Sequence, residues 1–134
     1  MRFPVQQAMW FTGKHPLENP NYGKIINEKH FQRLQNLLHA SQHVWGGQSD
    51  TAELRIAPAI LDNVTWDDAV MQEEIFGPVL PILTYDSLDQ AIRKINSLAH
   101  PLALYLFTSD QTVAKKVTAR SVSYTHLRAH ETEL

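Results

Sequence analysis

The stretch VLPILTYDSLDQAIRKINSLAHPLALYLFT, residues 79–108, decides the predicted fold. Its first seven residues form an apolar run of strand length, and Pro81, which has no amide proton to donate, favours an edge position or the beginning of the strand. Apolar residues then recur at helical spacing over residues 88–98. The segment 102–107 is apolar without alternation, which is typical of a strand covered on both faces.

A strand, a helix and a second strand within about thirty residues form a right-handed crossover unit. Downstream, Ser109 or Asp110 is predicted to cap another helix, whose Val113, Ala114 and Val117 face inward. The sequence therefore predicts the α/β class, with a parallel-type sheet and covering helices.

The region upstream supplies a further helix and two short strands. The helix is predicted from Asn27, which can cap it, to Ala40, and its apolar residues form one stripe: Phe31, Leu34, Leu37 and Leu38. Residues 43–45 resemble a strand that enters a turn at Gly46 and Gly47, and residues 55–61 resemble a second strand. Trp45 is expected to pack rather than to stack on a ligand.

The composition excludes several classes of protein. The chain has 134 residues, with 12 Lys and Arg against 14 Asp and Glu, a net charge of −2 and no cysteine. The charge lacks the basic excess of a nucleic-acid binder, and the missing cysteines exclude disulfides and thiolate zinc sites. No apolar run reaches the ~20 residues of a membrane span, and we expect a cytoplasmic protein.

One loop combines the residue types of a binding site. It is Glu73–Pro78, in which Gly77 and Pro78 form a sharp turn before the strand, so that Glu74 and Phe76 are predicted at the mouth of the sheet. A carboxylate can accept both hydroxyls of a vicinal diol such as a ribose, while an aromatic face packs beside it. The alternative is that the two glutamates only solvate the loop and that Phe76 fills the core.

The sequence QEEIFGPVLPI, residues 72–82, resembles the Glu-x-Phe-Gly-Pro signature of the aldehyde dehydrogenase superfamily. Flanking blocks agree in order: NPNYGKIINEKHFQRL, VWGG, IAPAIL and HPLALYLFT. The resemblance covers residues 16–120 and is strongest to the class 3, fatty aldehyde dehydrogenase-like branch.

The resemblance implies NAD- or NADP-dependent oxidation of an aldehyde to a carboxylic acid by a homo-oligomeric parent enzyme. In that family the glutamate that matches Glu74 holds the hydroxyls of the nicotinamide ribose, and the aromatic residue that matches Phe76 packs beside the nicotinamide. These two residues are the predicted cofactor-binding residues, and no catalytic or metal-binding residue is predicted in the chain.

The sequence also departs from the family. The family's nucleophile is a cysteine, which this chain lacks, and its general base and phosphate-binding segment lie upstream of the resemblance. We therefore expect residues 1–120 to be a C-terminal slice of the catalytic region, inactive alone. The competing hypothesis is a small non-catalytic α/β binding or regulatory module, and a mis-assembled reading frame that is never translated is a third.

The tail and the scattered polar residues are expected to carry no site. Residues 121–134 form a predicted non-native tail, because VSYTHLRAHET resembles translated sequencing adapter; the helical spacing of His126 and His130, with Glu131, would suit zinc, but we predict no such binding. The acidic and basic residues Glu28, Lys29 and Arg33 are predicted to be a solvated helix face. Scattered surface or cap positions are expected for the remaining histidines: His15, His30, His39, His43 and His100.

Overall fold

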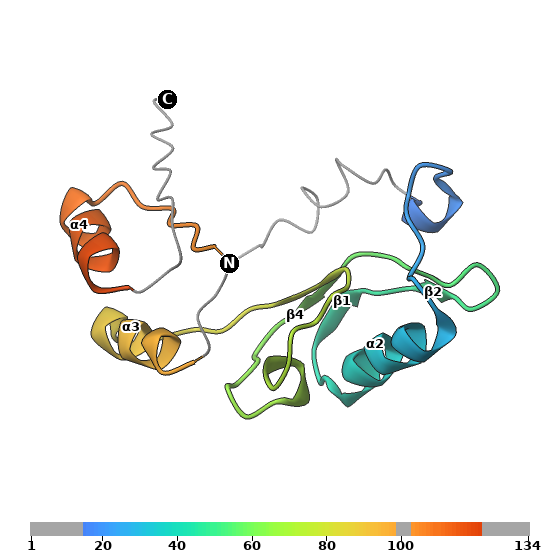
Figure 1. The fold of residues 1–134 in the computed structure, drawn as a ribbon, viewed down its shortest axis with the longest axis horizontal. Helices are drawn as coiled ribbons and strands as arrows, with labels where there is room; N and C mark the ends of the chain where they lie inside the picture. Colours follow the sequence, from blue (N-terminus) through green and yellow to red (C-terminus); the bar gives the residue numbers. More distant parts are fainter. Residues whose placement is uncertain (1–14, 99–102, 122–134) are drawn as a thin grey trace. The chain divides into compact units, whose positions relative to one another are not determined.

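The computed structural model describes residues 15–98 and 103–121 and divides the chain into two compact units, residues 1–84 and 85–134 (Figure 1). His100, Leu102 and the predicted tail beyond residue 121 lie outside the described residues. No helix in the described ranges is long and apolar enough to cross a membrane.

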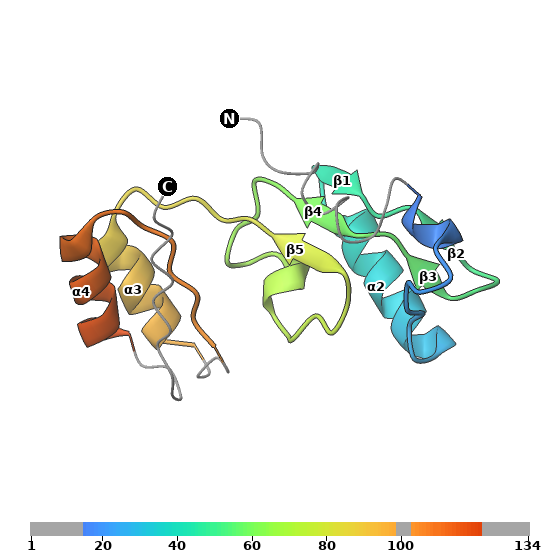
Figure 2. The ribbon, with the colours of Figure 1, turned by 90° about the horizontal axis from the view of Figure 1, so that it is seen from above.

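The first unit is built on a three-stranded sheet in the order β1-β4-β5 (Figure 2). β1 (Val44–Gly46) runs antiparallel to β4 (Ala59–Leu61), and β4 runs parallel to β5 (Val79–Pro81). β2 (Ser49–Asp50) and β3 (Arg55–Ile56), which come between β1 and β4 along the chain, form a separate two-stranded antiparallel sheet. The α/β class is confirmed, and the sheet is mixed, with its parallel pair between β4 and β5.

Helix α2 (Glu28–Ala40) covers one face of this sheet and forms the core with it. The predicted cap is confirmed, since the Asn27 side chain accepts a hydrogen bond from the His30 amide at 2.8 Å. Phe31 and Leu34 are fully buried and pack in one cluster with Leu61. The predicted apolar stripe is confirmed, because all four of its residues are buried.

Two predicted strands are shorter than expected. The run 55–61 is divided between β3 and β4, because Pro58 has no amide proton and its carbonyl turns to accept from the Gly47 amide at 3.1 Å. The run 79–85 forms a strand only as far as Pro81, which lies on the edge strand β5. Edge placement agrees with a residue that cannot donate to a neighbouring strand.

The sheet face turned away from α2 is apolar and exposed. Trp45 and Leu80 are both aligned with Ile60, so the three residues form one row across the sheet. Trp45 is 59% exposed and Leu80 is 58% exposed. Trp45, which was expected to pack rather than to stack on a ligand, is thus more than half exposed on this face.

The second unit contains helices α3 (Leu88–Asn96) and α4 (Gln111–Arg120), which lie side by side (Figures 1 and 2). Asp110 caps α4 by accepting from the amides of Thr112 and Val113. Ser87 occupies the N-cap position of α3 without a side-chain hydrogen bond.

The predicted buried strand at 102–107 is wrong for the described residues 103–107. They form no strand, and Tyr105 is 80% and Phe107 89% exposed. A strand needs a hydrogen-bonded neighbour, and no segment in the described part of the chain pairs with this one. The predicted strand–helix–strand unit is consequently incomplete.

Asp89 joins the two helices of the second unit. Its carboxylate accepts from Lys116 Nζ at 2.7 Å and from the Arg120 guanidinium. These hydrogen bonds, with Lys116 the larger cause, lower the pKa of Asp89 below its ordinary value of 3.8. The carboxylate therefore contributes stability that is present above that ordinary value and is lost as the pH falls through the lowered folded pKa.

We expect acidification below about pH 4 to loosen the α3–α4 pairing, and Asp89→Asn to remove this transition. The measurement is the pH dependence of the α3 and α4 amide chemical shifts by NMR. Asp86→Asn, which alters an exposed carboxyl just before α3, is the matched control and should leave the transition in place. An unchanged acid transition in Asp89→Asn would contradict the assignment.

Candidate functional site

The loop between η2 (Ala69–Met71) and β5 carries the two predicted cofactor-binding residues. Phe76 lies in this loop with φ of 49°, and its side chain is 73% exposed. A left-handed backbone costs an L-residue roughly 1–2 kcal/mol, and it is a genuine outlier for a bulky side chain. The fold therefore keeps this aromatic ring exposed to solvent, and the backbone of Phe76 is strained as a result.

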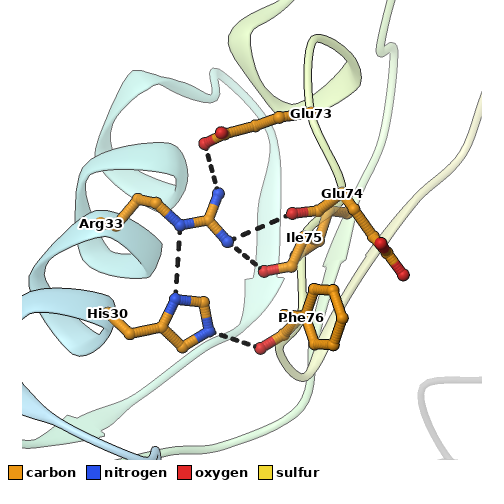
Figure 3. Close-up of polar contacts among 6 residues, drawn as sticks. All are labelled: His30, Arg33, Glu73, Glu74, Ile75 and Phe76. Atoms are coloured by element: carbon orange, nitrogen blue, oxygen red, sulfur yellow. Dashed lines mark hydrogen bonds and ion pairs between the residues drawn. The ribbon is translucent and has the colours of Figure 1, made fainter.

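Arg33 of α2 binds the loop from the side of the helix (Figure 3). Its guanidinium donates to Glu73 Oε1 at 2.5 Å and to the carbonyl of Glu74 at 3.3 Å. It also donates to the carbonyl of Ile75. One side chain thus contacts three consecutive residues of the loop.

His30, one helical turn before Arg33, binds the next residue. Its Nε2 lies 2.6 Å from the carbonyl oxygen of Phe76, and its Nδ1 lies 3.4 Å from Nε of Arg33. Because Arg33 can only donate, Nδ1 must accept. The hydrogen-bond pattern therefore assigns the neutral tautomer in which Nε2 carries the proton and donates it to Phe76.

The Glu74 carboxylate points away from Arg33, as Figure 3 shows. It is exposed and has no hydrogen-bond partner among the residues that the structure describes. Phe76 lies two residues on, with its ring turned away from His30. The predicted pair thus shares one exposed loop, and the alternative in which Phe76 fills the core is wrong.

The sequence did not predict that two polar side chains of α2 bind the loop. Arg33, predicted to be solvated, and His30, predicted to be scattered, both bind the loop. Their partners are mostly backbone carbonyls about forty residues away, which leave no mark in a sequence pattern. The only available signal was the spacing of three, which places both residues on one side of a helix.

A hollow of about 230 Å³ lies elsewhere in the first unit. It is lined by Leu37 of α2, by Ser41, which follows the helix, and by Asn63 and Val70. Asp68 also lines it, but its carboxylate accepts from the Thr65 amide at 2.7 Å within a local turn. The hollow does not include Glu74 or Phe76. It therefore adds nothing to the loop site.

Residues 15–98 and 103–121 contain no cluster of three or more His, Cys, Asp or Glu side chains able to hold a metal ion. The histidines of the tail lie outside those ranges.

Comparison with known proteins agrees with the motif. The model of the aldehyde dehydrogenase family matches residues 5–126. A curated relative, the 4,4'-diaponeurosporen-aldehyde dehydrogenase of Staphylococcus aureus, is 51% identical over 109 residues, covering 80% of this chain and 24% of the relative. Aldehyde dehydrogenase family 3 member B1 of Bos taurus is 52% identical over 113 residues, covering 84% and 24%.

Solved structures give the same result. The substrate-bound state of Staphylococcus aureus AldH matches with a TM-score of 0.82 and 46% identity over 87% of this chain and 26% of that one. The Mycobacterium tuberculosis aldehyde dehydrogenase complexed with NAD+ matches with a TM-score of 0.64 and 26% identity, covering 76% and 23%.

This chain spans about a quarter of the length of the curated relatives that it matches. Its similarity to family 3 members confirms the predicted branch. On the strength of the family match and these identities, the chain belongs to the aldehyde dehydrogenase family.

Proposed function

We propose that this chain supplies the nicotinamide-ribose contact of an NAD- or NADP-dependent enzyme that oxidises an aldehyde to a carboxylic acid. The observation that carries the proposal is the exposed Glu74 carboxylate beside the exposed Phe76 ring, on a loop whose backbone is tied to α2. Family membership supports the reaction class.

The residues present fit the cofactor's sugar. An ionised carboxylate has two acceptor oxygens and no donor, so Glu74 can accept from both ribose hydroxyls at once. Phe76 offers an apolar face that is already out of the core, and such a face packs well against a sugar or a flat ring. An exposed aromatic ring on a strained backbone is also typical of binding sites.

The role of these contacts is positional. When bound, nicotinamide supplies the hydride acceptor. Glu74 would limit the rotation of the ribose, and Phe76 would pack beside the nicotinamide and limit its movement. Holding two reacting groups in line removes a large entropic part of the barrier.

The remaining chemistry belongs to other parts of the proposed whole enzyme. Cysteine is absent from this chain, and a serine hydroxyl is too weakly ionised near neutrality to replace a thiolate readily. We therefore propose that the chain alone is inactive. We also propose, from the family resemblance, that the whole enzyme is a homo-oligomer. A non-native tail from residue 121 and a cytoplasmic location both stay predictions.

Glu74→Gln should slow hydride transfer about ten- to a hundredfold, because a hydrogen bond to a charged group is worth about 1.5–3 kcal/mol and each 1.36 kcal/mol is tenfold. The measurement is pre-steady-state kinetics in a hybrid enzyme, in which residues 16–120 replace the matching segment of the Staphylococcus aureus relative. The dissociation constant of the nucleotide should change less than the hydride step.

The matched control is Glu53→Gln, which neutralises an exposed glutamate in the turn between β2 and β3. It should leave both constants unchanged. A hydride step in Glu74→Gln equal to that of the unmodified hybrid would refute the proposed role.

A further inference from the structure

We propose that Arg33, together with His30, is a positioning residue that fixes Glu74 and Phe76 in the orientation needed to hold the ribose. This inference rests on the proposed function and deepens it. Neither Arg33 nor His30 needs to touch the cofactor, because both act through the backbone of the loop (Figure 3).

The first support is the continuity of the contacts. The pair binds Glu73 through its carboxylate and then Glu74, Ile75 and Phe76 through their carbonyl oxygens. Four consecutive residues are thus tied to two side chains one turn apart. With its carbonyl turned toward Arg33, Glu74 can present its carboxylate on the opposite side.

The second support is the rigid packing of helix α2, which carries both side chains. Phe31 and Leu34 follow His30 and Arg33 in sequence, and both are fully buried. α2 is therefore anchored in the core beside each of the two polar residues. A side chain on a packed helix transmits its position to the loop that it binds, whereas one on a mobile loop would not.

The third support is the strained backbone at Phe76. A non-glycine residue keeps a left-handed conformation only where its surroundings over-determine it. The His30 Nε2 contact to the Phe76 carbonyl, 2.6 Å long, supplies one such constraint. Arg33 supplies the constraint on the preceding peptide through the Ile75 carbonyl.

Positioning explains the pair better than stability does. The Arg33 side chain is 28% exposed and that of Glu73 is 60% exposed, and ion pairs in contact with solvent contribute little to folding. Removing Arg33 should consequently release the loop while leaving the core intact.

The first test needs no cofactor. In the full chain, Arg33→Met should lower the 15N order parameters of Glu74, Ile75 and Phe76 from about 0.85 to below about 0.6, which are typical rigid and flexible values. Lys29→Met is the matched control, because it removes an exposed charge from the same helix. It should leave the loop rigid. Unchanged order parameters in Arg33→Met would overturn the inference.

The second test is a double-mutant cycle in the hybrid enzyme. Arg33→Met should slow hydride transfer about tenfold, and it should add little in the Glu74→Gln background, since residues that act through one another are not additive. His30→Ala should behave similarly, and His30→Gln, whose amide can still donate to the Phe76 carbonyl, should recover part of the rate.

The outcomes separate the two proposals. If Glu74→Gln leaves hydride transfer unchanged, the proposed function fails whatever Arg33 does. If Glu74→Gln slows the step while Arg33→Met does not, or while the two losses multiply in full, the ribose contact stands and the positioning role is wrong.

Discussion

Gly46→Ala is expected to lower the free energy of unfolding by about 2–5 kcal/mol, combining left-handed strain of about 1–2 kcal/mol with overpacking of about 1–3 kcal/mol. Gly46 ends β1 with φ of 80°, a region that L side chains rarely adopt. A Cβ atom there would lie 2.2 Å from the carbonyl oxygen of Pro58.

The clash at Gly46 has no inexpensive relief, because the obstacle is backbone. The Pro58 carbonyl also accepts from the Gly47 amide at 3.1 Å, and Ala59, the next residue, pairs with Gly46 in the sheet. Moving Pro58 would therefore disturb both the turn and the β1–β4 pairing. Since whole domains are stable by about 5–15 kcal/mol, the loss should be a large share of the total.

The measurement is urea unfolding of the chain followed by tryptophan fluorescence, to which Trp45, adjacent to the substitution in β1, contributes together with Trp10 and Trp66. Gly23→Ala is the matched control, because a Cβ at Gly23 would meet nothing within 4 Å. It should unfold at nearly the same urea concentration as the unmodified chain. Equal midpoints for the Gly46 and Gly23 variants would contradict the prediction.

Sequence patterns predicted the elements that local chemistry determines. The helix from Asn27 to Ala40 was predicted with its cap and its buried stripe, because capping and helical spacing are short-range signals. The two-glycine turn after β1 was predicted for the same reason, and both glycines have positive φ.

Patterns failed where the outcome depends on a distant partner. An apolar run such as residues 103–107 indicates that the segment favours burial, but a strand forms only beside another strand. The division of 55–61 likewise follows from the contact of the Pro58 carbonyl with Gly47, eleven positions earlier.

In the candidate site, too, the residues of a local motif could be predicted and those that depend on distant partners could not. Glu74 and Phe76 could be selected from a contiguous motif, and the structure places both on one exposed loop. His30 and Arg33 could not, because they bind carbonyl groups that every residue possesses. The sequence specified which groups are available to a ligand, and the tertiary contacts determine how those groups are held.

Gly77 ties this loop to the core and gives the second large effect. A Cβ atom at Gly77 would lie 2.6 Å from both terminal methyl carbons of Leu34. Leu34 is fully buried between helix and sheet, so its side chain cannot swing away. Gly77→Ala should cost about 1–3 kcal/mol by overpacking, and Leu34→Ala should cost about 2–5 kcal/mol by leaving a cavity.

The two substitutions should compensate each other, because the new methyl group at residue 77 enters the space that Leu34 vacates. We expect the double variant to lose less unfolding free energy than the two single variants lose together, by about 0.5–3 kcal/mol, which is the usual range for residues in contact. Urea unfolding of all four proteins measures this coupling, and Gly23→Ala combined with Leu34→Ala is the control that should show strict additivity. Strict additivity in the Gly77 pair would instead mean that the loop does not rest on Leu34. In that event the packing that brings Glu74 and Phe76 beside α2 would have to be assigned to Arg33 and His30 alone.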